Sequence, residues 1–289
     1  MTLAELVADT ERQLIEAGVS FGHGTTNAHD EAAWLVLHAL GLPLDTDIDG
    51  PEGKQPAAPD GQARTATLLK ARIDTRQPLA YLLKEAWLQG VPFYVDERAI
   101  VPRSLIAEVL ADGSIDPWLS DQTHRVLDLC TGNGSLAVLA ALAWPEVQVD
   151  AADLSVEALA VARINVEKHG LKDRIKPIES DGLHNCPGPY DLILCNPPYV
   201  NVASMAALPA EFRAEPALAL AGGADGMDFI RALLRDAPTR MNERAVLVLE
   251  IGHERTHFET AFPRLNPVWL DTSAGGDQVL LLTCEALAP

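Results

Sequence analysis

The sequence feature that most constrains the fold is a regular alternation of strand and helix patterns between residues 125 and 262. Short apolar runs typical of buried strands alternate with longer stretches whose apolar residues recur at helical spacing. Strand patterns cover 125–129, 147–153, 174–179, 190–195 and 245–251, and helix patterns cover 135–143, 155–169, 226–237 and 253–262. This alternation, with short connections, predicts an α/β fold with a mostly parallel sheet covered by helices on both faces.

Two more strand patterns close the chain, at 267–271 and 277–283, without a strong helix between them. They predict an antiparallel hairpin at one edge of the sheet. With this hairpin, the expected sheet has seven strands.

The residues before the alternation have a different character. Helical spacing at 2–17, 28–40 and 62–75 predicts a small helical domain, and the stretch 43–61, rich in Pro, Gly and Asp, predicts a long loop. The stretch 87–95 has strand-forming residues around a Gly-Val-Pro turn, which indicates a short hairpin. The expected division is a helical domain at 1–85, a hairpin linker at 86–102 and a catalytic α/β domain at 103–289.

The charge balance narrows the classes of partner. The chain has 22 basic and 41 acidic side chains, which gives a formal net charge of −19. Neutralising phosphates needs clustered Lys and Arg, so direct recognition of nucleic acid is not expected. The longest apolar run, 136–144, is about half the length that a membrane span needs, so no membrane partner is expected.

The four cysteines give no metal signature. Cys130, Cys186, Cys195 and Cys284 form no Cys-x-x-Cys pair, and no pair of histidines lies nearby at zinc spacing. We therefore expect no metal and a reducing compartment. Acidic residues in the first turn argue against a signal peptide, so a cytoplasmic location is expected.

The first chemical motif, Asp128-Leu-Cys-Thr-Gly-Asn-Gly-Ser135, lies where the first strand meets its helix. Gly132 and Gly134 permit backbone angles closed to other residues and allow close approach of a ligand. Asp153 ends the next strand, at the spacing where an acid meets ribose hydroxyls in nucleotide-binding sheets. A structural turn would also use these glycines, but the position at the carboxyl edge of the sheet favours a cofactor site.

The residues around this loop favour S-adenosylmethionine over a dinucleotide. The third glycine of the dinucleotide fingerprint is replaced by Ala137, and Asp128 would repel a diphosphate. An acid there suits a ligand with ammonium and sulfonium charges and no phosphate. Asp181, within Ser-Asp-Gly after the third strand, is a candidate for the adenine amino group, although a turn or helix cap explains it equally well.

The second motif, Asn196-Pro197-Pro198-Tyr199, directly follows the fourth strand at the same expected sheet edge. It could be a plain turn. However, a planar amide is a poor nucleophile, and it needs acceptors that hold both N–H groups and aim its nitrogen at the methyl group. The Asn196 side-chain oxygen and the Pro197 carbonyl could supply these acceptors on a loop stiffened by prolines, and Tyr199 could pack on the planar group.

Together, the two motifs resemble class I S-adenosylmethionine-dependent methyltransferases that act on planar nitrogens. The stretch 72–108 and the segments Glu215-Pro-Ala-Leu-Ala-Leu220 and Gly222-Gly-Ala-Asp-Gly226 are similar, more narrowly, to the protein glutamine N5-methyltransferases. The resemblance implies a Rossmann-like seven-stranded catalytic domain and a small helical domain that presents the substrate. It also implies S-adenosylmethionine as cofactor and S-adenosylhomocysteine as product.

The family has two bacterial branches, which act on peptide-chain release factors or on a large-subunit ribosomal protein, the one numbered three. Val101-Pro-Arg-Ser104 and the Cys130 loop resemble the ribosomal branch, whereas the release-factor branch typically has Pro where Ser104 stands. The resemblance therefore implies a basic ribosomal protein as partner. A release factor remains the alternative, and a nucleic-acid base methyltransferase, a catalytically inactive binding factor and a dinucleotide oxidoreductase are more distant ones.

The motifs and the resemblance together define an expected site. Catalysis is assigned to Asn196, Pro197, Pro198 and Tyr199. Cofactor binding is assigned to Asp128, Cys130, Thr131, Gly132, Asn133, Gly134, Ser135, Asp153, Leu154, Asp181, Gly182, Leu183 and Asn196. Leu183 is included because the family often has a bulky residue beside the adenine where this chain has Gly182. Substrate binding is assigned to Asn196, Pro197, Tyr199, Arg103 and Glu215, although an ion pair for Arg103 and a solvated loop for Glu215 are equally good interpretations.

Overall fold

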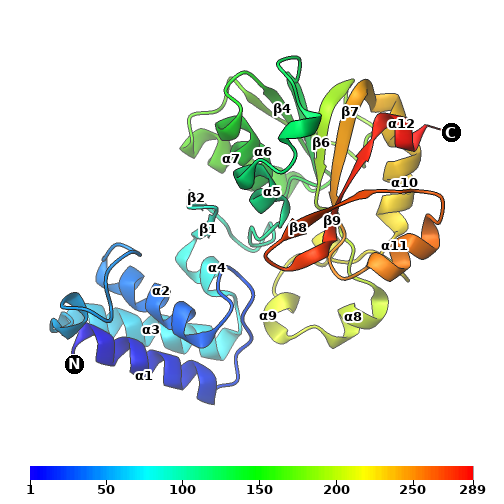
Figure 1. Cartoon of the computed structure of the whole chain (residues 1–289). Helices are drawn as coiled ribbons and strands as arrows, with labels where there is room; N and C mark the ends of the chain where they lie inside the picture. The colour runs from blue at the N-terminus through cyan, green and yellow to red at the C-terminus, as the bar shows by residue number, and fades with distance from the viewer. Residues whose placement is uncertain (289) are drawn as a thin grey trace. The chain divides into compact units, whose positions relative to one another are not determined.

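The computed structural model describes residues 1–288 and divides the chain into two compact units (Figure 1). The helical unit comprises Met1–Ala86 together with Leu208–Glu215. The sheet unit comprises Trp87–Ala207 and the chain from Pro216 onward. The division differs from the expected one in two places, because the hairpin after Ala86 lies in the sheet unit and a short segment, residues 208–215, lies in the helical unit.

The three expected helices of the helical unit are present as α1 (Leu3–Glu16), α2 (Ala28–Leu40) and α3 (Pro59–Thr75). Local capping explains where they begin: the Thr2 side chain accepts from the Glu5 amide in a capping box, and Asn27 accepts from the Asp30 amide. Two short helices were not predicted, α4 (Leu79–Leu83) and α9 (Ala210–Arg213). The expected loop 43–61 contains one 3₁₀ turn, Glu52–Lys54.

Buried charges hold the segment 208–215 in the helical unit. Arg72 is fully buried, and its Nε donates to Glu31 Oε1 at 2.7 Å while its Nη1 donates to Glu211 Oε1 at 3.4 Å. The Ser20 amide donates to the same Glu211 oxygen at 3.0 Å. A buried arginine needs such partners, so the segment is part of the unit's core.

The sheet unit contains the seven-stranded sheet that the sequence predicts, in the order β5-β4-β3-β6-β7-β9-β8. The strands β3 to β7 pair in parallel, and β9 pairs antiparallel with both β7 and β8, so the expected edge hairpin is confirmed. The strands are β3 (Arg125–Leu129), β4 (Gln148–Asp153), β5 (Ile175–Glu179), β6 (Tyr190–Cys195), β7 (Met241–Glu250), β8 (Val268–Thr272) and β9 (Gly275–Thr283).

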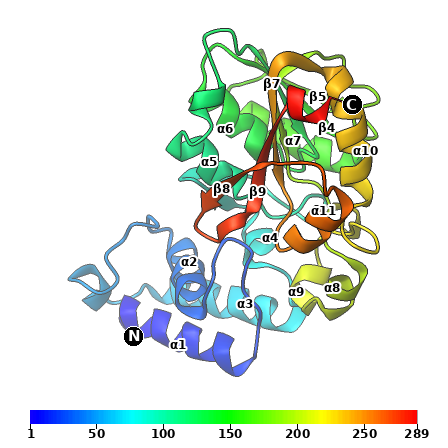
Figure 2. The ribbon, with the colours of Figure 1, turned by 45° about the vertical axis from the view of Figure 1, so that its right-hand side comes forward.

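Helices cover both faces of this sheet (Figure 1 and Figure 2). On one face lie α5 (Ile106–Asp112), α6 (Ser135–Ala143) and α7 (Val156–Lys168), and on the other α10 (Asp228–Asp236), α11 (Arg255–Ala261) and α12 (Cys284–Leu287). Successive strand residues alternate between the two cores. Leu192 and Leu194 pack with the first set of helices, whereas Ile193 and Cys195 pack with the second.

The remaining elements of the sheet unit are short. The hairpin consists of β1 (Ala86–Leu88) and β2 (Val91–Phe93), with Gln89 and Gly90 both at positive φ. Helix α8 (Val202–Ala207) follows the Asn196–Tyr199 loop and was not predicted. Its side chains are not buried, so it lacks the apolar periodicity that a sequence pattern detects.

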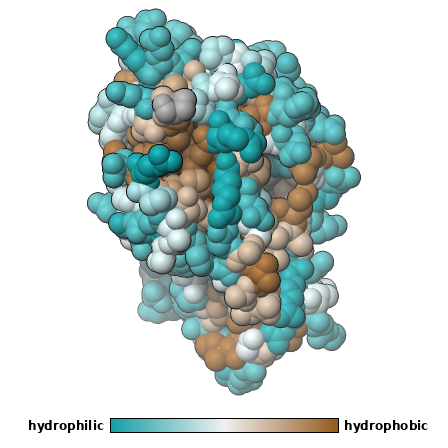
Figure 3. Space-filling view, turned by 90° about the vertical axis from the view of Figure 1, so that its right-hand side faces the viewer, coloured by the Kyte–Doolittle hydropathy of each residue, from teal (hydrophilic) through white to brown (hydrophobic). Residues whose placement is uncertain are grey.

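Hydrophilic residues cover most of the face shown in Figure 3, with hydrophobic residues between them in separate patches. Along residues 1–288, the structure contains no helix with the length and apolar character that a bilayer crossing requires.

Candidate active site

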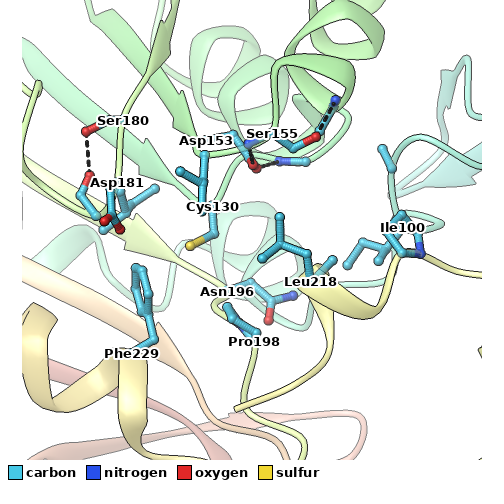
Figure 4. Close-up of a pocket in the computed structure, with 18 of the residues that line it drawn as sticks. Ile100, Cys130, Asp153, Ser155, Ser180, Asp181, Asn196, Pro198, Leu218 and Phe229 are labelled. Carbon is cyan, nitrogen blue, oxygen red and sulfur yellow. Dashed lines mark hydrogen bonds between the residues drawn. The ribbon is translucent and has the colours of Figure 1, made fainter. Parts of the chain in front are cut away.

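A cavity opens at the carboxyl edge of the sheet, where β3, β4 and β6 end. Its volume is about 130 Å³. In Figure 4, Asp153 and Ser155 lie on one side of it, Asn196 and Pro198 lie on the other, and Cys130 lies between them. The two loops that the sequence singles out therefore border one cavity.

The loop after β3 owes its shape to left-handed backbone angles. Cys130 has φ 61°, Gly132 has φ 55° and Gly134 has φ 82°. A Cβ atom at Gly134 would lie 3.1 Å from Cβ of Ala162 on α7, so glycine lets the two segments approach closely. A Cβ atom at Gly132 would point into open space, so there the positive φ is the reason for glycine.

Asp153 fixes the loop that it faces. Its Oδ2 accepts from the Gly132 amide at 2.8 Å, and its Oδ1 accepts from the Ser155 amide at 2.9 Å. Burial raises the pKa of Asp153, although these backbone hydrogen bonds act against it. A carboxylate has about four acceptor positions, so both oxygens can still accept a hydroxyl from the cavity that Asp153 lines.

Asp128 lies beneath the loop and is almost completely buried. Its Oδ2 accepts from the Thr131 hydroxyl and from the Ala137 amide, whereas no partner within residues 1–288 reaches its Oδ1. Burial raises the pKa of Asp128 to about 7. Asn133 has a similar orphan, its buried Nδ2. Neither side chain lines the cavity, so these two buried polar atoms without partners lie behind the loop that does.

The Asn196–Tyr199 loop emerges from the end of β6. Asn196 and Pro198 are half-buried and line the cavity, and Pro197 is buried. The Tyr199 hydroxyl donates to Glu250 Oε1 at 3.2 Å, and a Cβ atom at Gly252 would lie 2.5 Å from the Tyr199 ring. Tyr199 is therefore packed against the protein, outside the cavity lining.

The segment 220–226 supports this loop from another side. The Val200 amide donates to the Leu220 carbonyl at 2.8 Å, and the Gly222 amide donates to the Val200 carbonyl at 2.9 Å. A Cβ atom at Gly222 would lie 2.7 Å from the Tyr199 backbone, and one at Gly226 would lie 2.3 Å from the Tyr199 carbonyl oxygen. These contacts give a physical reason for the glycines in the Gly222–Gly226 segment.

The expected cofactor residues fall into two groups. Those that line the cavity are Cys130, Gly132, Asp153, Leu154, Asp181, Gly182 and Asn196. Those that are buried and outside its lining are Asp128, Thr131, Asn133, Gly134, Ser135 and Leu183. The Leu183 side chain packs in the core and lines a neighbouring groove. Phe229 of α10 lines the cavity instead, 4.0 Å from where a Cβ atom at Gly182 would lie.

The expected substrate residues outside the loop, Arg103 and Glu215, do not line the cavity. Arg103 donates to the Val101 carbonyl at 3.2 Å. Glu215 belongs to the helical unit, where it is buried with its Oε2 3.4 Å from His23 Nε2. The interpretation of Glu215 as part of a solvated loop is therefore wrong, because the chain folds back into the helical core at this point.

Several cavity residues were missed by the sequence reasoning, namely Arg98, Ala99, Ile100, Leu129, Ser155, Ala158, Pro216, Leu218, Ala219 and Phe229. Arg98 comes from the expected linker, where its guanidinium donates to both oxygens of Asp96 at 2.8 and 2.7 Å. This bond lowers the pKa of Asp96 to about 2. No short motif marks these residues. Pro216, Leu218 and Ala219 lie in the segment Glu215–Leu220, which is similar to the protein glutamine N5-methyltransferases.

Reactive side chains are scarce around the cavity. Contact with the Cys195 thiol and burial raise the pKa of Cys130, which keeps this thiol protonated. His253, which could serve as a base by its side-chain type, is exposed and precedes α11. Among residues 1–288, no group of three or more His, Cys, Asp or Glu side chains is arranged to hold a metal ion.

The fold and the two loops define a class I methyltransferase, and the family model "Methyltransferase small domain" matches residues 114–223. Three curated relatives, from Bordetella pertussis, Burkholderia pseudomallei and Neisseria meningitidis, are 54%, 48% and 46% identical to this chain. Each match covers 99% of this chain and 94–96% of the relative. All three are named ribosomal protein uL3 glutamine methyltransferase, and the chain belongs to this family.

A solved structure supports the fold alone. The catalytic domain of hMettl16, solved in complex with MAT2A 3′UTR hairpin 1, has a TM-score of 0.54 and 15% identity to this chain. The match covers 87% of this chain and 90% of that domain.

Proposed function

We propose that this protein transfers a methyl group from S-adenosylmethionine to the N5 amide nitrogen of a glutamine in ribosomal protein uL3. The observation that carries the proposal is the shared cavity: Asn196 lines the same space as Gly132 and Asp153, so an amide held by Asn196 would lie beside a cofactor held by the other two. The target follows from relatives that are 46–54% identical and are named for uL3.

The cavity suits S-adenosylmethionine, which supplies an electrophilic methyl group when bound. Asp153 can accept hydrogen bonds from ribose hydroxyls, and Phe229 offers an aromatic face for the adenine. The orphan Asp128 Oδ1 offers an acceptor for an ammonium group or for a water that bridges to it. Four residues outside the cavity lining stabilise the loop in its conformation with positive φ angles: Thr131, Asn133, Gly134 and Ser135.

Asn196 and Pro197 position the nucleophile. The Asn196 Oδ1 and the Pro197 carbonyl accept the two N–H groups of the glutamine amide, which fixes the amide plane and turns the nitrogen face towards the methyl group. Pro197 and Pro198 fix φ and donate no N–H, so the loop presents acceptors on a stiff support. Positioning of this kind can supply several kcal/mol of a barrier. The proton that the nitrogen loses can leave to water.

The acidic surface agrees with this substrate class. A net charge of −19 favours encounter with a basic ribosomal protein and disfavours RNA phosphates. The helical unit is the expected platform for recognising that protein.

The proposal is tested with purified enzyme, labelled S-adenosylmethionine, and uL3 or a release factor as acceptor. We expect label on uL3, at a glutamine that mass spectrometry identifies. Label on the release factor alone would overturn the choice of target, and label on RNA alone would overturn the substrate class.

The role of Asn196 is tested by Asn196→Ala, which should lose transfer by about a hundredfold or more while cofactor affinity stays near wild type. Asn242→Ala is the matched control, because Asn242 also makes a side-chain hydrogen bond, to Asp191, but at the opposite end of the sheet. Normal turnover of Asn196→Ala would remove this residue from the mechanism.

A further inference from the structure

Glu250 is a buried acid that the mechanism has not used. It ends β7, next to the strand from which the Asn196–Tyr199 loop emerges, and its side chain is almost completely buried. The register pairs Cys195 with Leu249, so Glu250 and Asn196 are the next residues along the two neighbouring chains. Glu250 therefore lies level with the start of the loop.

Three donors converge on Glu250. Its Oε1 accepts from the Tyr199 hydroxyl at 3.2 Å, and its Oε2 accepts from the Ser104 hydroxyl at 2.6 Å and the Leu105 amide at 2.9 Å. Ser104 and Leu105 come from the segment before α5. One carboxylate thus joins that segment to the last residue of the loop.

The residues after Glu250 hold the same loop at two more points. Gly252 lets the Tyr199 ring pack directly on the backbone. Glu254 is buried, and its Oε1 accepts from Asn201 Nδ2 at 2.6 Å. The segment Glu250–Glu254 therefore contacts both the ring and the hydroxyl of Tyr199, and a residue just beyond it.

The two prolines give these contacts a consequence at Asn196. Pro197 and Pro198 have fixed φ angles, so little backbone freedom separates Asn196 from Tyr199. A shift of Tyr199 is transmitted to Asn196 instead of being absorbed between them. Displacement of a positioning group by about 1 Å can cost a hundredfold in rate.

We propose that Glu250 is a positioning residue for methyl transfer, which acts through Tyr199 to set the place of Asn196. It touches neither substrate nor cofactor in this role. Tyr199 anchors the loop through its hydrogen bond to Glu250. The reaction therefore requires its hydroxyl more than its aromatic face. The inference rests on the proposed function, because the affected step is transfer to an amide held by Asn196.

The test compares Glu250→Ala, Glu250→Gln and Tyr199→Phe, singly and in the double variant Glu250→Ala/Tyr199→Phe. Glu250→Ala and Tyr199→Phe should each lower kcat by about tenfold to a hundredfold, with KM for uL3 and the Kd for S-adenosylmethionine within about twofold of wild type. Glu250→Gln should retain most of kcat. The side-chain oxygen of the glutamine can keep the hydrogen bonds from Ser104 and Leu105, and its NH₂ group can donate to the Tyr199 hydroxyl. The double variant should be no slower than the slower single variant.

Tyr190→Phe is the matched control. The Tyr190 hydroxyl donates to Asp150 Oδ2 at 2.8 Å, so it is also a tyrosine–carboxylate pair in this sheet, but it lies at the opposite end of β6. This variant should lose stability while kcat remains unchanged.

The outcomes separate the two proposals. Wild-type enzyme without transfer to any glutamine would defeat the proposed function, whereas hydrogen exchange at the Val200 and Val202 amides reports on the loop without any substrate. Faster exchange in Glu250→Ala supports the positioning role, and unchanged exchange contradicts it. Full kcat in Tyr199→Phe, additive losses in the double variant, or an equal loss in Glu250→Gln would each overturn the inference.

Discussion

Cofactor binding should depend on pH through Asp128. This carboxyl is buried, its Oδ1 has no partner within the described residues, and its pKa is raised to about 7. Below that pH the free protein carries a neutral Asp128, which cannot offer an anionic acceptor to a cationic ligand. The apparent affinity for such a ligand then weakens as pH falls, because only the molecules with an ionised Asp128 are competent to bind it.

The size of the effect follows from this pKa. About three quarters of the molecules have an ionised Asp128 at about pH 7.5 and about one in eleven at about pH 6, so the apparent Kd for S-adenosylmethionine should rise by about eightfold between them. The same shift makes the cofactor-free protein less stable as pH rises from about 4 to about 7, because the folded state holds a proton that the unfolded state has released. For one group this loss amounts to roughly 4 kcal/mol.

Calorimetry of S-adenosylmethionine binding across this pH range measures the effect, with Asp128→Asn as the key variant. The asparagine keeps an acceptor for the Ala137 amide and removes the titration, so its Kd should be weaker at about pH 7.5 and nearly independent of pH. Asp153→Asn is examined in parallel, because the pKa of Asp153 is also raised and acts in the same direction. A flat wild-type Kd, or the full slope in Asp128→Asn, would refute the reasoning.

Three further perturbations test other parts of the structure. Arg72→Ala should lower the free energy of unfolding by about 3–5 kcal/mol, because it removes the buried cation that Glu31 and Glu211 share; a loss below about 1 kcal/mol in chemical denaturation would contradict this. Gly252→Ala should cost about 1–3 kcal/mol and slow methyl transfer, since its methyl group would meet the Tyr199 ring; thermal unfolding and a turnover assay report on both. Added salt should lower kcat/KM for uL3, and a rate insensitive to salt would exclude electrostatic steering.

The sheet was predictable because its information is local. Most strands are short apolar runs, most turns carry Gly or Pro, and the carboxyl ends of parallel strands meet at one edge, so the Gly132 and Asn196 loops could be placed together from sequence. The supports of the loops could not be placed, because Glu250 and Ser104 meet across 146 residues of chain and neither forms a motif. The aromatic ring near Gly182 could not be placed for a related reason, because it comes from Phe229, on a helix distant in the sequence.

Because of the segment 208–215, the helical unit is formed from two stretches that are separate in the amino-acid sequence. A fragment that ends at residue 86 would contain Arg72 and Glu31 but lack Glu211, and so would bury a positive charge with half of its anionic partners missing. Exchange of the helical unit between relatives therefore has to move two separate stretches of sequence. Because Pro216, Leu218 and Ala219 line the cavity, substitutions at the end of segment 208–215 are covalently adjacent to the cavity wall.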